Sequence, residues 1–243
     1  MADLRHRAED DAASARDRDA HANRLNQMVA TLADLLREGT VALPVLEQND
    51  TDALQHLKDE FWMTVCVALT RFATSRRGQM TALAVHPDAS PIDANGQLDP
   101  PGPRVDLTAC ACWANNASLM EDPVTEPVAE PTSERHNGSS GPKDGEIHAE
   151  AHLIARAAAQ GHSLTHWTLY ITYPPCATCL RSILCSGIRR CVHRQTLLSP
   201  HAQLMADRHH VQLVSMTDRL RDAARVQRVR HMWSRWDGLN ALR

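Results

Sequence analysis

The chain has 243 residues, and its 26 Lys and Arg against 29 Asp and Glu give a formal net charge of -3. Such a balance does not mark nucleic acid as the main partner, because nucleic-acid-binding domains are commonly basic. Its 43% hydrophobic residues can build a core, but the longest apolar stretch, 62–69, is too short for a membrane helix of roughly 20 residues. The acid-containing N-terminus resembles no secretory signal, and seven cysteines are an odd number. We therefore expect a reduced, intracellular, cytoplasmic protein without a membrane partner.

Residues 1–50 are expected to form an N-terminal helical extension. The first twenty are charged and rich in alanine, so a helix there has no apolar face and is expected to be solvated or partly disordered. From Leu25 onward the apolar residues recur at helical spacing, and Gly39 closes the run. This face must dock on the main domain or on a partner chain. Its members are Leu25, Met28, Val29, Leu32, Leu35 and Leu36.

A main domain is expected over residues 51–243. Apolar residues at helical spacing predict a helix over 54–72, and two β-rich segments, 80–85 and 105–113, suggest a hairpin. Residues 117–147 contain four prolines, three glycines, seven acids and only two basic side chains. This composition predicts a disordered insertion rather than core.

The rest of the chain alternates helices with strands, which predicts an α/β fold with a sheet layered by helices. A weaker apolar segment and a long basic helix follow. The predicted segments are a helix over 148–160, a strand over 167–173, a helix over 177–186, a strand over 188–193, the apolar segment 211–214 and a helix over 217–236.

Two short motifs carry the chemistry: His148-Ala149-Glu150, and Pro175-Cys176-Ala177-Thr178-Cys179 after 24 intervening residues. Cysteines three positions apart at the start of a helix can face one point, and a helix N-terminus favours the thiolate form that binds metal. With His148 they supply three ligands and leave a fourth tetrahedral position for water, which is typical of catalytic zinc. Glu150 is placed to move protons to and from that water.

These motifs resemble those of the zinc-dependent cytidine and deoxycytidylate deaminase superfamily, over roughly residues 59–193. The resemblance implies a three-layer α/β/α sandwich with a mixed sheet of about five strands. It also implies a hydrolase in which His148, Cys176 and Cys179 hold Zn²⁺ and Glu150 is catalytic. Water would attack C4 of a cytosine ring, and ammonia would leave.

Details of the motifs point within the superfamily to a deoxycytidylate (dCMP) deaminase. The stretch 172–176, Thr-Tyr-Pro-Pro-Cys, is similar to these enzymes, whereas tRNA adenosine deaminases carry a glutamate where this chain has Pro174. The resemblance implies that Asn115, the Ala149 backbone, Tyr173 and Pro174 bind the nucleotide, with Asn116 a close competitor of Asn115. Since many relatives are oligomeric, a homo-oligomer is expected.

Other interpretations of the cysteines and histidines remain open. The Cys-x-x-Cys pair is also found in redox proteins and in half-sites for structural zinc, and His148 with His152 suggests a metalloprotease, although the glutamate is displaced by one position. Cys110 and Cys112 alternate as core residues of a strand do. The remaining candidates are Cys185, Cys191 and His193. They could form a second metal site, but we favour the interpretation that they are buried core residues.

The basic C-terminal helix supports an alternative function. Its arginines and two tryptophans suit RNA phosphates and bases, which favours a tRNA or RNA base deaminase (C-to-U or A-to-I). We favour the simpler interpretation, in which the apolar positions pack on the sheet and the arginines are solvated. A catalytically inactive zinc-binding relative is a third possibility, which the intact Glu150 disfavours. The arginines are Arg219, Arg221, Arg225, Arg228, Arg230 and Arg235.

Overall fold

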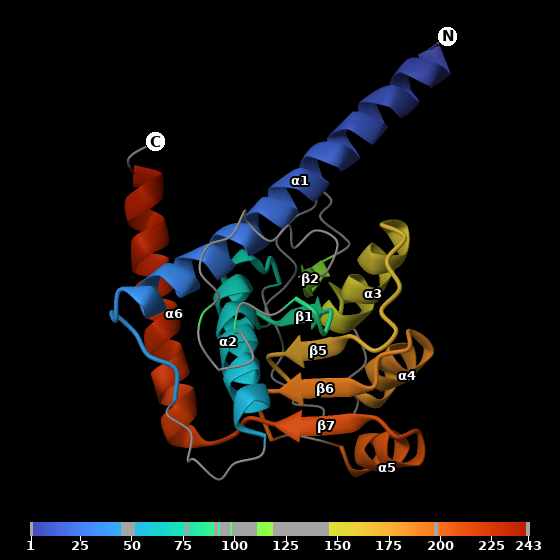
Figure 1. The fold of residues 1–243 in the computed structure, drawn as a ribbon. Coiled ribbons are helices and arrows are strands. Elements are labelled where there is room, and N and C mark those ends of the chain that lie inside the picture. Colours follow the sequence, from blue (N-terminus) through green and yellow to red (C-terminus); the bar gives the residue numbers. More distant parts are fainter. Residues whose placement is uncertain are drawn as a thin grey trace, which may run out of the picture.

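The structure, a computed structural model, describes residues 2–44, 52–75, 78–89, 92, 98, 111–118, 146–196 and 199–241. Helices cover both faces of a central sheet (Figure 1). The elements are α1 (Ala2–Arg37), α2 (Ala53–Leu69), a short 3-10 turn η1 (Thr70–Phe72), β1 (Thr81–Val85), β2 (Ala111–Asn115), β3 (Ala117–Ser118), β4 (Glu146–Ile147), α3 (Ala149–Ala159), β5 (Thr168–Ile171), α4 (Ala177–Cys185), β6 (Arg190–His193), α5 (Pro200–Arg208), β7 (Gln212–Ser215) and α6 (Arg219–Ala241).

The main sheet has five strands in the order β2-β1-β5-β6-β7. Strand β1 pairs antiparallel with both β2 and β5, and β5, β6 and β7 run parallel. The predicted hairpin is present, with Thr81 opposite Asn115 and Val85 opposite Ala111. Residues 105–110 of its predicted second strand, Cys110 among them, lie outside the described residues. The mixed five-stranded sheet confirms the predicted fold class.

Helices α3, α4 and α5 cover one face of the sheet (Figure 1). The sheet turns small side chains to this face, including Ala82, Ala84 and Cys112, so helices can approach closely. Helix α5 is absent from the sequence-based prediction, because its buried face consists of two alanines, Ala202 and Ala206.

Helices α1, α2 and α6 cover the other face (Figure 1). The apolar residues predicted for the N-terminal helix pack here: Leu25, Met28, Leu32 and Leu35 are buried in the core cluster of α2 and α6. The face therefore docks on the chain's own domain. The α1 backbone is helical from Ala2, and its first part extends beyond the rest of the fold.

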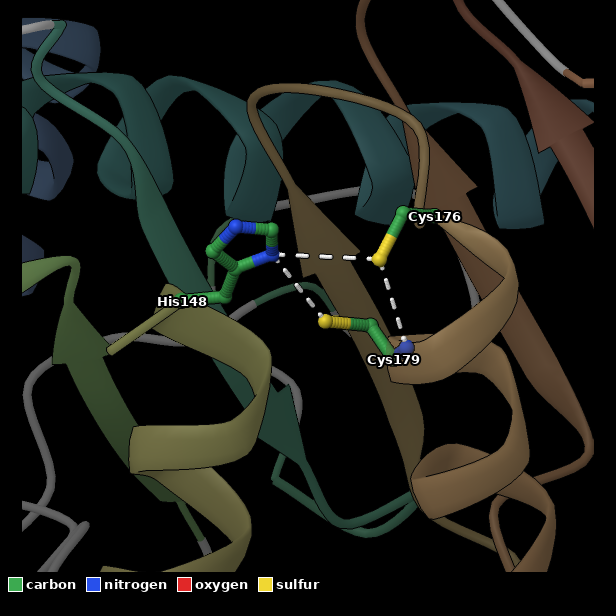
Figure 2. A group of neighbouring side chains, drawn as sticks. All are labelled: His148, Cys176 and Cys179. Atoms are coloured by element: carbon green, nitrogen blue, oxygen red, sulfur yellow. Dashed lines mark hydrogen bonds between the residues drawn. The ribbon is translucent and has the colours of Figure 1, made fainter. Parts of the chain in front are cut away.

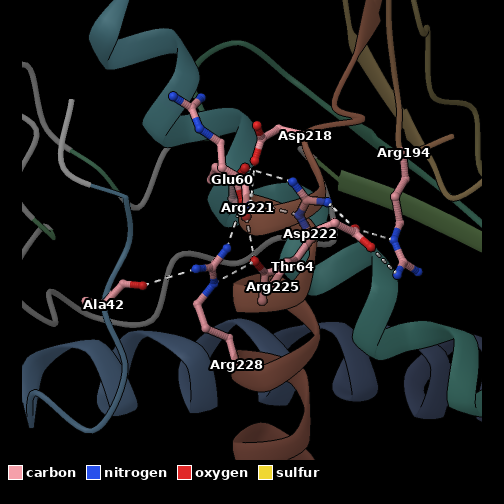
Figure 3. A network of polar contacts seen from close by, with 9 residues as sticks. All are labelled: Ala42, Glu60, Thr64, Arg194, Asp218, Arg221, Asp222, Arg225 and Arg228. Atoms are coloured by element: carbon pink, nitrogen blue, oxygen red, sulfur yellow. Dashed lines mark hydrogen bonds and ion pairs between the residues drawn. The ribbon is translucent and has the colours of Figure 1, made fainter. Parts of the chain in front are cut away.

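The basic helix α6 is held to α2 by buried ion pairs (Figure 3). Glu60 on α2 binds Arg225 Nη2 at 2.7 Å through Oε1 and Arg228 Nη2 at 2.8 Å through Oε2. Arg225 also contacts Asp222, which binds Arg194 at the end of β6. The expectation that these arginines are solvated is wrong for two of them, since Arg225 is 0% and Arg228 4% exposed. The carboxylates of Glu60 and Asp222 offset their charges, which allows burial.

A second buried ion pair lies between α2 and the sheet. Arg190 on β6 makes a two-pronged contact with Asp59 at 2.7 and 2.8 Å, and the Tyr170 hydroxyl donates to the same carboxylate at 3.0 Å. Across the described ranges, every helix is too short or too polar for a membrane span.

Candidate metal centre

The three predicted ligands come from the starts of two helices (Figure 2). His148 precedes α3 and Cys176 precedes α4, both with extended backbone, and Cys179 lies in the first turn of α4. The Cys179 backbone N–H donates to Cys176 Sγ at 3.4 Å, which caps the helix with a thiol. His148 Nδ1 lies 3.8 Å from Cys176 Sγ and 3.3 Å from Cys179 Sγ. The fold thus brings together side chains that are about thirty positions apart in the sequence.

These distances fit a single zinc ion. With Zn–S near 2.3 Å and Zn–N near 2.0 Å, tetrahedral geometry places nitrogen and sulfur about 3.5 Å apart, between the two observed separations. Two thiolates and an imidazole are a donor set that suits zinc. Within the described part of the chain, His148, Cys176 and Cys179 form the one group of three or more potential ligands close enough to share an ion. Three protein ligands leave one tetrahedral position open, as in catalytic zinc sites.

Hydrogen bonding prepares one thiol for metal binding. The Cys179 side chain lowers the pKa of Cys176 to about 4, and the same contact raises the pKa of Cys179. The hydrogen bond with Cys176 also raises the pKa of His148. A thiol with a depressed pKa is a thiolate at neutral pH, which is the form that binds a metal.

Glu150 lies beside the ligands, in the first turn of α3. It is 9% exposed, and this burial raises the pKa of its carboxyl group, while a hydrogen bond from its own backbone N–H and the charge of His148 oppose that rise. A buried carboxyl with a raised pKa can both accept and donate a proton near neutral pH.

Glu150 and two of the ligands open onto a cleft of about 420 Å³, a size typical of small-ligand sites. The predicted contacts Ala149, Tyr173 and Pro174 all line it, and Tyr173 is 43% exposed. The complete lining is Gly78, Met80, Thr81, His148, Ala149, Glu150, Ile171, Thr172, Tyr173, Pro174, Pro175, Cys176 and Ser199.

Asn115, the fourth predicted substrate contact, lies behind the cleft wall. Its Oδ1 accepts a hydrogen bond from the Thr81 hydroxyl, and its Nδ2 donates to the Leu69 carbonyl at 3.2 Å. Thr81 itself lines the cleft, as does Thr172, whose hydroxyl accepts from the Thr81 N–H. The sequence analysis assigned neither threonine to the cleft, although Thr172 begins the Thr-Tyr-Pro-Pro-Cys stretch, because threonine at a strand end is an ordinary β-former. The competitor Asn116 is fully buried.

The other candidate ligands lie elsewhere. His152 Nδ1 is 2.9 Å from the Asn115 carbonyl and is not part of the ligand group. Cys191 and His193 are buried as expected for core residues, whereas Cys185 is exposed. Within the described residues these last three form no metal-binding group. The metalloprotease interpretation requires His152 to be a metal ligand, and the second-metal interpretation requires Cys185, Cys191 and His193 to lie together. The described residues meet neither requirement.

Residues 57–195 match the family model described as the cytidine and deoxycytidylate deaminase zinc-binding region. Over 51 residues, 21% of the chain, it is 43% identical to the deoxycytidylate deaminases of Enterobacteria phages T2 and T4. That stretch spans 27% and 26% of their lengths, about a quarter of each curated relative. Among solved structures, the dCMP deaminase of cyanophage S-TIM5 in apo form is similar at 16% identity and a TM-score of 0.42, covering 65% of this chain and 96% of that one.

Proposed function

Since the chain belongs to the family of cytidine and deoxycytidylate deaminases, we propose that it is a zinc-dependent hydrolase acting on a cytosine nucleotide. The reaction replaces the exocyclic amine of the base with the oxygen of a water molecule and releases ammonia. The observation that carries this proposal is the buried Glu150 carboxyl beside the His148, Cys176 and Cys179 donors, at the surface of a small-ligand cleft.

Glu150 is the proton carrier in this proposal. Zinc, when held by the three donors, supplies a Lewis acid that makes water nucleophilic at neutral pH. Glu150 takes a proton from the attacking water while the C4–O bond forms, and delivers that proton to N3 of the base. It then transfers the second proton of the water to the amine as the C4–N bond breaks. Burial suits Glu150 to this work because it raises the pKa of the carboxyl group, which makes the group a better proton acceptor.

The cleft walls orient the base. The Ala149 backbone and the Tyr173–Pro174 segment border the cleft from two sides. We infer that Asn115 acts on the nucleotide through Thr81: the Thr81 hydroxyl donates to Asn115, so its lone pairs remain to accept a hydrogen bond from a ligand in the cleft.

Our preferred substrate is deoxycytidylate. Support comes from the Thr-Tyr-Pro-Pro-Cys stretch over 172–176 and from the local identity to the phage T2 and T4 proteins, which bear the name deoxycytidylate deaminase. A solved structure of the dCMP deaminase from cyanophage S-TIM5 is a complex with dCMP and dUMP, and that protein is 19% identical in sequence to this chain.

The alternative RNA substrate has less support than the sequence of α6 suggests. Arg225 and Arg228 are buried against Glu60, and Arg235 is paired with Glu38. Arginines that neutralise carboxylates in this way are not offered to RNA phosphates.

The test is a substrate panel on purified, zinc-loaded protein: dCMP, CMP, deoxycytidine, cytidine and tRNA, with conversion followed by mass spectrometry. We expect conversion of dCMP to dUMP with a shallow dependence on salt. Deamination of tRNA without action on dCMP, with a steep salt dependence, would establish the RNA alternative instead. Zinc-loaded protein inactive on every member would favour the inactive zinc-binding relative. Sedimentation of the same preparation measures the expected homo-oligomer.

A further inference from the structure

A buried amide and a carboxylate tie the strand that precedes His148 to a separate part of the chain. Asn116 Oδ1 accepts from the Met80 N–H at 2.9 Å, and its Nδ2 donates to the Gly78 carbonyl at 2.7 Å and to Glu146 Oε1 at 3.3 Å. The Glu146 carboxylate also accepts from the Ser75 hydroxyl. These contacts join β4 to Ser75, Gly78 and Met80, which precede β1.

These bonds occupy the polar atoms of the Asn116 side chain. Its oxygen has an acceptor role to Met80, its amide hydrogens serve Gly78 and Glu146, and the residue is 0% exposed. Asn116 is therefore a structural hub and not a substrate contact. The Asn116 backbone N–H adds a bond to the Met80 carbonyl at 3.1 Å.

The position of this hub matters because β4 leads directly into a metal ligand. Strand β4 contains only Glu146 and Ile147, pairs with the equally short β3, and is followed at once by His148. A two-residue ladder gives weak support on its own. The imidazole must nevertheless meet two sulfurs that belong to α4. The hydrogen bonds of the Glu146 side chain to Ser75 and Asn116 hold β4 in place in addition to this short backbone pairing.

We propose that Glu146 and Asn116 are a positioning pair that holds His148 in register with Cys176 and Cys179. The pair acts on the backbone that carries the imidazole and touches neither substrate nor metal. Asn116 also fixes Gly78 and Met80, which line the cleft, so that the contact between Glu146 and Asn116 links the metal ligand to a neighbouring wall. The inference rests on the proposed function only through the ligand role of His148.

The test measures zinc affinity of the metal-free protein by competition with a chelator, together with its melting temperature, and requires no turnover. Glu146→Ala is expected to weaken zinc binding about tenfold, the lower range for groups that orient metal ligands. Glu146→Gln keeps an amide oxygen that accepts from Ser75 and Asn116, and is expected to restore most of the affinity. Glu38→Ala is the matched control: it removes an exposed carboxylate that pairs with Arg235 far from the site.

Unchanged zinc affinity in Glu146→Ala would overturn the proposal, as would a Gln variant as weak as the Ala variant. If Glu146→Ala fails to fold, Ser75→Ala decides, because it removes one bond to the same carboxylate and only one oxygen atom. We then expect a smaller weakening at an unchanged melting temperature, and wild-type affinity would contradict the role. Absence of turnover in wild-type protein would count against the proposed function and would leave these zinc measurements intact.

Discussion

The two faces of the sheet differ in what they bury. Toward α3, α4 and α5 the strands present small residues such as Ala82 and Ala84, whereas toward α1, α2 and α6 they present large ones such as Leu83 and Tyr170. The first face holds the zinc ligands and Glu150 at the edge of a cleft. The second buries complete ion pairs centred on Glu60 and Asp59.

The charged residues on the two faces therefore have different roles. Near the cleft a carboxyl group is available for the proposed reaction, whereas behind the sheet carboxylates stabilise the fold. Beside the cleft, Glu150 has no arginine partner among the described hydrogen bonds and ion pairs, and burial raises its pKa. Behind the sheet, Glu60 is matched by Arg225 and Arg228, which satisfies the group and makes it inert. Substitutions on the two faces should therefore change different measured quantities.

The largest effect is expected from Cys176→Ala or Cys179→Ala. Either change removes one of three donors, so we expect loss of stoichiometric zinc and a lower melting temperature, because metal binding is coupled to folding. Elemental analysis of purified protein measures the first and thermal unfolding the second. Near-stoichiometric zinc in either variant would contradict the ligand assignment.

On the opposite face, Glu60→Ala is expected to lower the free energy of unfolding by about 3–5 kcal/mol, because two buried guanidinium groups lose their carboxylate. Denaturant titration measures this change. The exposed Glu38→Ala variant is the control and should unfold almost as the wild type does. The zinc content of folded Glu60→Ala should be unchanged. If zinc is lost together with stability, the proposed difference between the two faces is contradicted.

Glu150→Gln should have the reverse profile. We expect turnover of dCMP to fall at least about a hundredfold, the lower range for a positioned acid/base, with zinc content and unfolding preserved. Steady-state kinetics and metal analysis on one preparation test this expectation. A variant with near-normal turnover would remove Glu150 from the proton-carrying role.

The smallest effect concerns the cleft wall. Thr81→Val and Asn115→Ala are each expected to raise KM for dCMP about tenfold, the free energy of roughly one hydrogen bond. If Asn115 acts through Thr81, the double variant is no worse than either single one, because the second change removes a contact already lost. Additive effects would mean that Asn115 reaches the substrate independently. Thr70→Val, which removes a hydroxyl bonded to the Val67 carbonyl, is a control outside the cleft lining.

The site and the fold differ in how far the sequence predicts them. The zinc ligands are predictable because His148 and the Cys176–Cys179 pair each lie in a short motif at a helix start. The Glu60–Arg225 pair joins residues 165 positions apart, and no local pattern reveals which carboxylate meets which arginine. Helix α5 is not predicted because its buried positions are alanines. The position of Asn115 behind Thr81 is not predicted either, because it depends on side-chain orientation.

The short β3–β4 pair before His148 also determines where the chain between the two strands begins and ends. The chain departs at Ser118 and returns at Glu146, and these residues are paired partners in β3 and β4. Paired antiparallel residues lie roughly 5 Å apart, a gap that a tight turn of about two to five residues can bridge. Closure entropy rises slowly with loop length, so segments of very different size can occupy this position at similar stability. We therefore expect that the chain between Ser118 and Glu146 can be replaced by segments of other lengths while the β3–β4 pairing, and with it His148, stays in place.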